Sequence, residues 1–210
     1  MAADPDLIAQ FARGWAITRG VAGPRPYRGG HFIQVGQPDQ KARYIFPRLD
    51  REVVTELAQT ISEPFVFLKV CEAEDEVRAL LPQHWSIRRP PTYMMTAALA
   101  AAGTDLPLGY SLTLDGRGPI IKAAVLAEDL TVARGRVAML GDTALFDQIS
   151  TDEAHRRLGL GRALMQALTN VALERGAGNG LLSATQMGRC LYESIGWTLH
   201  SPYTSAVIPA

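Results

Sequence analysis

Cysteine, net charge and long apolar runs are all scarce in this chain of 210 residues. The two cysteines, Cys71 and Cys190, belong to no CxxC motif or Cys/His cluster, so the sequence predicts neither a zinc site nor a disulfide framework. The 21 basic and 21 acidic residues cancel, which argues against nucleic acid as the main partner because phosphate binding requires a basic excess. The 4 histidines are scattered along the chain, and we assign them no role.

No segment has the character of a membrane span or a signal peptide. The most apolar stretch, 93–102, is too short and too rich in alanine to cross a bilayer. Residues 1–6 carry acid where a signal peptide would carry base. Two isolated thiols fit a reducing compartment. We therefore expect a cytoplasmic protein with no membrane partner and no bound metal.

The second half of the chain alternates strand and helix patterns. Apolar residues at helical spacing predict a long helix over 158–174, and Arg175-Gly176 provides a cation and a flexible glycine at its end. The further predictions are strands over 110–114, 120–126, 132–140, 144–150 and 181–185, a helix over 187–194, and a closing hairpin of 197–199 and 204–208.

The first half mixes short elements with turn signals. Val53, Val54, Leu57 and Ile61 recur at helical spacing, so they predict a helix that starts at Asp50. The further predictions are helices over 7–13 and 74–81 and strands over 31–35, 43–46, 65–70 and 85–87.

An internal echo connects the two halves. Trp85, Pro90 and Thr92 match Trp197, Pro202 and Thr204 at a constant separation of 112 residues. Each block follows a helix, a short strand and a second helix. We therefore predict an N-terminal lobe over 1–95 and a second domain over 96–210, and we leave open whether the first is a degenerate copy of the second.

The segment from Arg156 to Gly161 follows a predicted strand and opens the long helix with glycines in its first turn. The first N–H groups of a helix have no partners within it, and the helix dipole adds partial positive charge there. A glycine has no Cβ to hold a ligand away from the backbone. With Arg156, Arg157 and Arg162 around it, this segment predicts a cradle for a pyrophosphate.

Two other phosphate motifs are excluded by sequence. A dinucleotide fingerprint needs a third glycine or alanine at the position of Leu164. A Walker loop needs Gly-Lys-Ser/Thr after the second glycine, and that is absent. A tightly packed helix terminus that happens to contain two glycines stays open as the structural alternative.

The motif resembles the cofactor motif of the GNAT superfamily of N-acetyltransferases, which Arg156, Gly159 and Gly161 satisfy at the family's spacing. The resemblance continues with Leu191-Tyr192 and Gly196-Trp197, and it covers about 120–208. It implies an α+β fold, the GNAT acyltransferase fold, with a central mixed, mostly antiparallel sheet flanked by helices.

The resemblance also implies a site for acetyl-CoA between the strands 144–151 and 181–185, which would splay apart. In relatives the backbone of the first strand pairs with the pantetheine arm, the glycine loop holds the pyrophosphate, and the tyrosine at the position of Tyr192 protonates the CoA thiolate. The implied cofactor-binding residues are Ile149, Ser150, Thr151, Arg156, Arg157, Leu158, Gly159, Leu160, Gly161, Arg162, Ala163 and Thr185.

Three features depart from the family pattern. Relatives often have asparagine where this chain has Thr185. No glutamate occurs early in the strand 144–150, and its one carboxylate, Asp147, suits a turn or salt bridge better than a general base. Between Leu114 and Ile120 there is no room for the two helices that family members place between their first two strands. We therefore expect the N-terminal lobe to supply the acceptor wall.

The resulting prediction is an acyltransferase that moves an acetyl group from acetyl-CoA to a primary amine by direct attack in a ternary complex. The expected partner is a small-molecule or peptide amine, and a homodimer is kept open as the assembly. The alternative is a non-catalytic acyl-CoA-binding regulatory module. The absence of an evident general base and the threonine at position 185 in place of asparagine both favour this alternative.

Overall fold

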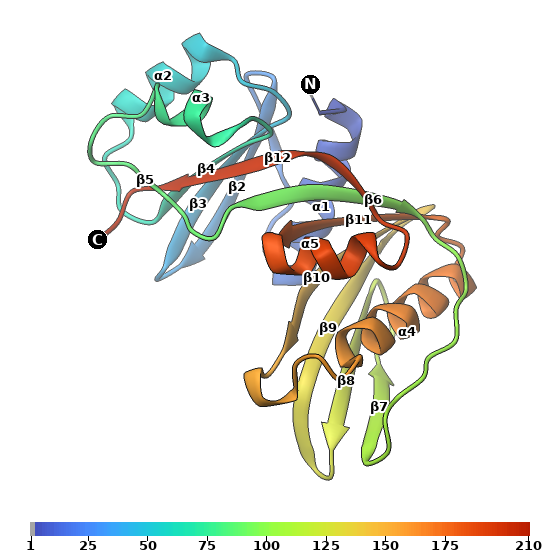
Figure 1. Ribbon diagram of the computed structural model, residues 1–210. Helices are drawn as coiled ribbons and strands as arrows, with labels where there is room; N and C mark the ends of the chain where they lie inside the picture. The colour runs from blue at the N-terminus through green and yellow to red at the C-terminus, as the bar shows by residue number, and fades with distance from the viewer. Residues whose placement is uncertain (1–2) are drawn as a thin grey trace. The chain divides into compact units, whose positions relative to one another are not determined.

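The computed structural model describes residues 3–210, which form two compact units (Figure 1). Met1 and Ala2, where the predicted N-terminal lobe begins, lie outside the described residues. The first unit comprises the chain up to Met95 together with 183–189 and 199–210, and the second comprises 96–182 and 190–198. Each unit contains a mixed sheet flanked by helices, which confirms the predicted α+β fold class.

The first unit is built on a mixed sheet in the order β1-β2-β3-β4-β12, with β5 paired to β12. The strands β3 and β4 run parallel and are joined by a helix, whereas the other neighbours are antiparallel. The elements are α1 (Pro5–Arg19), β1 (Arg25–Tyr27), β2 (Gly30–Gln37), β3 (Gln40–Phe46), α2 (Arg51–Thr60), β4 (Val66–Val70), α3 (Glu74–Arg78), β5 (Ser86–Ile87) and β12 (Thr198–Val207).

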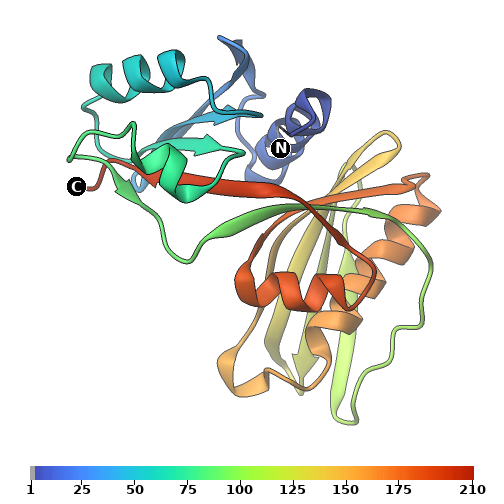
Figure 2. The ribbon, with the colours of Figure 1, turned by 45° about the horizontal axis from the view of Figure 1, so that its top comes forward.

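Helices cover both faces of this sheet (Figures 1 and 2). On one face, residues of α2 and α3 pack with Leu68, Val70 and Ala206 in a fully buried cluster. On the other face, Phe11 of α1 meets Tyr203 of β12 edge to face, with ring centroids 5.5 Å apart. Alternate residues of β4 and β12 therefore face two different environments.

The first helix is longer than predicted, because 7–13 is only the middle of α1. Asp4 caps the helix by accepting a hydrogen bond from the N–H of Asp6 at 2.9 Å, and Pro5 occupies the first turn. Gly14, the predicted end, is buried inside the helix, and the chain turns instead at Gly20 in the left-handed conformation. Tertiary packing outweighs the low helix propensity of one interior glycine.

The second unit carries the antiparallel meander β7-β8-β9-β10, to which β11 adds in parallel to β10. The helix α4 packs across β8, β9 and β10 (Figure 2). The elements are β7 (Tyr110–Asp115), β8 (Ile120–Ala127), β9 (Leu130–Leu140), β10 (Thr143–Thr151), a 3-10 turn (Glu153–His155), α4 (Leu160–Glu174), β11 (Asn179–Thr185) and α5 (Gln186–Glu193), the last two crossing into the first unit.

The predicted closing hairpin is wrong, because 198–207 is one continuous strand, β12. Its pairing with β4 covers Thr204 to Val207, so Pro202 needs no N–H for that ladder and is tolerated within the strand. The apolar stretch for which we predict no element also contains a strand, β6 (Thr92–Ala98). No helix among residues 3–210 has the length and hydropathy of a membrane span.

Candidate active site

The two parallel strands of the second unit separate halfway along β10. Their register runs from Thr143, opposite Asn179, to Phe146, opposite Leu182, and ends there. On its other side β10 stays paired to β9 as far as Thr151. One edge of the β10 backbone therefore has no strand partner within residues 3–210 from Asp147 onward. A strand edge of this kind can accept an extended ligand as an added strand.

A β-bulge lies at the point of separation. The register with β9 shifts between Asp147 and Ser150, and Gln148 has a positive φ of 56°. A bulge bends its strand and increases the local twist, so it turns the end of β10 away from its previous course. The side chain of Ile149 packs over Gly135 of β9, where any Cβ would collide with the Ile149 Cδ1 atom. No local sequence pattern indicates this role of Gly135.

The helix α4 begins without a side-chain cap. Its N-cap residue, Gly159, is left-handed with φ 82°, and the first turn contains no acidic residue. The Gly159 carbonyl accepts the N–H of Ala163 at 3.0 Å, which leaves the N–H groups of Leu160, Gly161 and Arg162 ahead of the first helical hydrogen bond. This terminus therefore offers three N–H groups and a positive dipole to an anion.

Gly161 allows two elements to approach each other closely. A Cβ at this position would lie 3.1 Å from the Leu191 Cδ2 atom of α5 and 3.7 Å from the Thr151 hydroxyl of β10. Gly161 therefore has a packing reason as well as the ligand reason that the motif predicts. Close packing against Leu191 and access for a ligand each require that position 161 has no side chain.

The three arginines of the motif have different surroundings. Arg156 donates from Nε to the Thr151 carbonyl at 3.2 Å, and Arg162 donates to the Ser194 hydroxyl at 3.0 Å. Arg157 makes no hydrogen bond or ion pair with any residue in 3–210, and it is exposed with a φ of 65°. Of the three, Arg157 is the guanidinium most available to a phosphate.

The remaining residues of the predicted loop divide between surface and core. Leu158 is 45% exposed, whereas Leu160 and Ala163 are fully buried. These two buried residues can contact a ligand only through their backbone, and the Ala163 N–H is already used within the helix. His155, which the sequence left without a role, lies 2.9 Å through Nδ1 from the Tyr110 hydroxyl of β7.

Tyr192 is buried in α5 beside Trp197, with ring centroids 6.1 Å apart. Burial, and secondarily the negative charge of Asp147, raises the pKa of Tyr192 to about 12. The phenol is therefore protonated throughout the physiological range, as a hydrogen-bond or proton donor must be. The proximity of Asp147 was not visible from the sequence, because β10 and α5 are separated by more than thirty residues.

Thr185 is the last residue of β11, and its hydroxyl accepts the N–H of Gly188 at 3.2 Å. It therefore caps the first turn of α5. The hydroxyl proton is still able to donate to another group.

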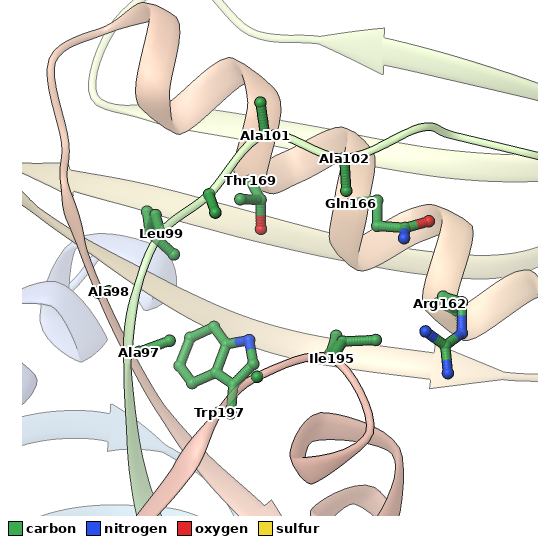
Figure 3. Close-up of a pocket in the computed structure, with 12 residues that line it drawn as sticks. Ala97, Ala98, Leu99, Ala101, Ala102, Arg162, Gln166, Thr169, Ile195 and Trp197 are labelled. Carbon is green, nitrogen blue, oxygen red and sulfur yellow. The ribbon is translucent and has the colours of Figure 1, made fainter.

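A pocket of about 240 Å³ lies beside α4 within the second unit (Figure 3). Arg162, Gln166 and Thr169 project into it from one face of the helix, and Trp197 and Ile195 line the opposite wall. The segment 97–102 closes one side with small apolar residues. Of this lining, only Arg162 was among the predicted site residues. Nowhere in 3–210 do three or more His, Cys, Asp or Glu side chains gather as a metal site would require.

Comparison with known proteins places this geometry in a family. Residues 122–199 match the family model of the acetyltransferase (GNAT) domain. No curated protein matches the sequence. The fold is similar to that of a GCN5-related N-acetyltransferase from Kribbella flavida, with 13% identity and a TM-score of 0.68 over 100% of this chain and 97% of that chain.

Two further solved structures share the fold. A putative acetyltransferase of the GNAT family from Novosphingobium aromaticivorans has 15% identity and a TM-score of 0.61 over 97% of each chain. A tandem GNAT protein from the clavulanic acid biosynthesis pathway has 13% identity and a TM-score of 0.55 over 86% of this chain and 79% of that chain. The match over residues 122–199 shows an acetyltransferase (GNAT) domain in this chain, in agreement with the predicted family and with the enzyme class of an acetyl-CoA-dependent acyltransferase.

Proposed function

We propose that this chain transfers the acetyl group of acetyl-CoA to a primary amine, with both substrates bound before the chemical step. The observation that carries the proposal is the coincidence of two features at one end of β10. The parallel strands part after Phe146, and the uncapped, arginine-flanked start of α4 follows directly. Together they offer a strand edge for a pantetheine arm and N–H donors for a pyrophosphate.

The proposed binding residues follow from the available groups. The N–H groups of Leu160, Gly161 and Arg162, with the Arg157 guanidinium, hold the pyrophosphate. The backbone of Ile149, Ser150 and Thr151 pairs with the amide-bearing arm. Arg156 and Leu158 complete the loop, the Thr185 hydroxyl adds a donor, and Ala163 anchors the helix in the core. Acetyl-CoA supplies the thioester that an amine can attack.

Tyr192 is the proposed catalytic residue. A thiol has a reference pKa of about 8.5, whereas burial raises the pKa of Tyr192 to about 12. The phenol is therefore a poor acid toward a free thiolate but a good hydrogen-bond donor to sulfur on which charge is developing. Its contribution grows as the thioester breaks, which is the requirement for a group that lowers the barrier.

We also propose that the first unit is a degenerate copy of the second. The sequence prediction of two domains, over 1–95 and 96–210, is consistent with this duplication. The starts of α3 and α5, Glu74 and Gln186, are 112 residues apart, as are those of β5 and β12, Ser86 and Thr198. This is the separation of the sequence echo. The likeness to a tandem GNAT protein supports the same interpretation.

The experiment that tests the function is calorimetry with acetyl-CoA followed by a CoA-release assay over a panel of primary amines. We expect saturable binding of acetyl-CoA and amine-dependent release of CoA, with the product identified by its mass. Binding without release by any amine would favour the non-catalytic alternative, and no binding would contradict the site. The identity of the amine acceptor, assembly as a homodimer and location in the cytoplasm remain predictions from the sequence.

A further inference from the structure

A second group of polar side chains lies in the first unit, on the face of the sheet that α1 covers. Lys69 of β4 is the direct cross-strand partner of Ser205 of β12, so the two side chains share this face. The Lys69 Nζ atom lies 5.5 Å from the ring centroid of Tyr203 and 5.6 Å from that of Phe67. The lysine ammonium is therefore placed among two strands and two aromatic rings.

Three arginines surround this lysine. Arg43 of β3 is 7% exposed, and its guanidinium carbon lies 3.7 Å from the ring centroid of Trp15, which Arg19 also approaches at 5.3 Å. With the amide of Gln40 turned so that its oxygen faces Arg43, this oxygen accepts from Nη2 and Nε at 2.6 and 2.9 Å. The guanidinium is thereby held in one orientation.

Among residues 3–210 no carboxylate is found to act on Lys69. The charged groups that act on it are Arg43, Arg88 and Arg19, in that order, and all are cations. Arg88 is held at the edge of the sheet, where its N–H donates to the Ser205 carbonyl at 2.7 Å. Arg19 and Arg88 are exposed or partly exposed and mark the side on which the group meets solvent.

The same group contains hydroxyls that lack a hydrogen-bond partner. The Tyr203 and Ser205 hydroxyls are buried, with residue exposures of 1% and 6%, and neither has a partner within residues 3–210. A buried polar group without a partner costs about 1 to 3 kcal/mol. Ser201 is a third such residue, but it lies beside the Cys71 thiol and we leave it aside. Two orphaned donors and a lysine amine whose charged neighbours are cations lie on one face of the sheet, and such a set is the complement of an anion.

We propose that Lys69, Tyr203 and Ser205 form a binding site for a small organic or inorganic anion that carries a carboxylate or a phosphate group. The ammonium and the two hydroxyls donate to the anion, Arg43 and Arg88 add positive potential, and the rings of Trp15 and Phe67 provide an apolar flank. The proposal does not depend on acetyl transfer, because every residue in it belongs to the first unit.

The site has a direct spectroscopic reporter. Burial, followed by Arg43, Arg88 and Arg19, lowers the pKa of Lys69 well below its usual range. An opposite charge within about 4 to 6 Å favours the charged form, so a bound anion raises the pKa of Lys69. The chain contains three lysines, Lys41, Lys69 and Lys122, so side-chain labelling gives three signals, two of which are internal controls.

The experiment is a pH titration of the full chain labelled with ¹³C at lysine Cε, without addition and with phosphate or benzoate at constant ionic strength. We expect the titration midpoint of the Lys69 signal to move upward when an anion binds, while the other two lysine signals serve as internal controls. A response to phosphate alone, to benzoate alone or to both identifies the preferred chemical group. Phosphate held at the start of α4 would leave the Lys69 signal in place.

Variants distinguish an anion-binding site from a cluster whose hydroxyl groups simply hydrogen-bond to water. Tyr203→Phe and Ser205→Ala each remove one donor and should weaken the anion about tenfold, as a hydrogen bond to a charged group is worth. Lys122→Met should leave the affinity unchanged. The proposal is overturned if the Lys69 signal responds to neither anion at millimolar concentration, or if both hydroxyl variants bind as tightly as the original chain. The titration of the unaltered chain decides the matter even where a variant fails to fold.

Discussion

Two parallel strand pairs within residues 3–210 are each joined by a helix, and they differ at the end where that helix begins. In the first unit β3 and β4 stay paired from Ala42 to Phe46, and the Cys71 N–H extends the ladder to the Phe46 carbonyl. In the second unit β10 and β11 part after Phe146. The β3–β4 pair therefore stays hydrogen-bonded up to the loop before its helix, whereas the β10–β11 pair separates before that point.

The N-termini of α2 and α4 also differ, because only that of α2 is capped by a side chain. In the first turn of α2 the Val53 N–H donates to the Asp50 carboxylate at 3.1 Å, and Pro47 in the preceding loop has no N–H at all. The start of α4 has glycine in place of the carboxylate and arginines in the loop. The same strand–helix connection can thus have its helix N-terminus capped by a carboxylate of the chain itself, or can leave that N-terminus available to an anionic ligand.

The largest effect should come from Tyr192, whose counterpart 112 residues earlier is Leu80. We expect Tyr192→Phe to lower kcat by about a hundredfold, the lower end for a proton donor, because the donor to sulfur is lost while the ring remains. The dissociation constant of acetyl-CoA should stay the same, as measured by calorimetry. An unaltered kcat with the best amine would reduce Tyr192 to a packing residue.

A smaller effect should separate the two helix starts directly. Arg157→Ala should weaken acetyl-CoA binding about tenfold, since a charged hydrogen bond to phosphate contributes about 1.5 kcal/mol or more. Arg48→Ala, the matched change in the exposed loop before α2, should leave binding unaltered. Calorimetry on both variants checks this pair. Equal losses would mean that the two starts are not functionally different.

The connection between β3 and β4 should in turn depend on the cap of α2. Asp50→Ala should cost about 1 kcal/mol of unfolding free energy, because the Val53 N–H loses its acceptor. Urea denaturation at neutral pH measures this cost, and Asp39→Ala, in the exposed turn between β2 and β3, is the control. A loss well below this value would show that solvent replaces the carboxylate at α2.

An effect confined to high pH concerns the buried phenols, Tyr192 in one unit and Tyr203 in the other. Burial raises both pKa values, that of Tyr192 to about 12, so at high pH the unfolded chain ionises first. The stability that they contribute is complete below about pH 10 and falls as the pH rises toward about 12. Urea midpoints at about pH 9 and about pH 11 should show this decline. Tyr192→Phe should make it shallower.

The site was predictable where local sequence determines backbone conformation. Gly159 must be left-handed and Gly161 must be small, so the spacing alone located the start of α4 within two residues. The strand β10 was located by its apolar pattern, and the long helix by its period. The ends of the first helix were predicted less well: the prediction began it at residue 7 and ended it before Gly14, whereas α1 runs from Pro5 to Arg19.

The rest depended on contacts between distant residues. Ile149 covers Gly135, and Asp147 influences Tyr192, but no local pattern links either pair. The bulge at Gln148 required a positive φ at a residue that rarely adopts one. The strand over 92–98 was hidden by its alanines, which have low strand propensity and gain their place from packing.

The pairing of β12 with β4 has a consequence for synthesis. The ribosome makes the residues of β4 first and delivers Thr204 to Val207 only after more than 130 further residues. During that interval the inner edge of β4 is unpaired and Leu68 has no finished core around it. We therefore expect the first half to emerge without reaching its final structure, to need protection from aggregation, and to become resistant to protease only after Thr204 to Val207 have left the ribosome.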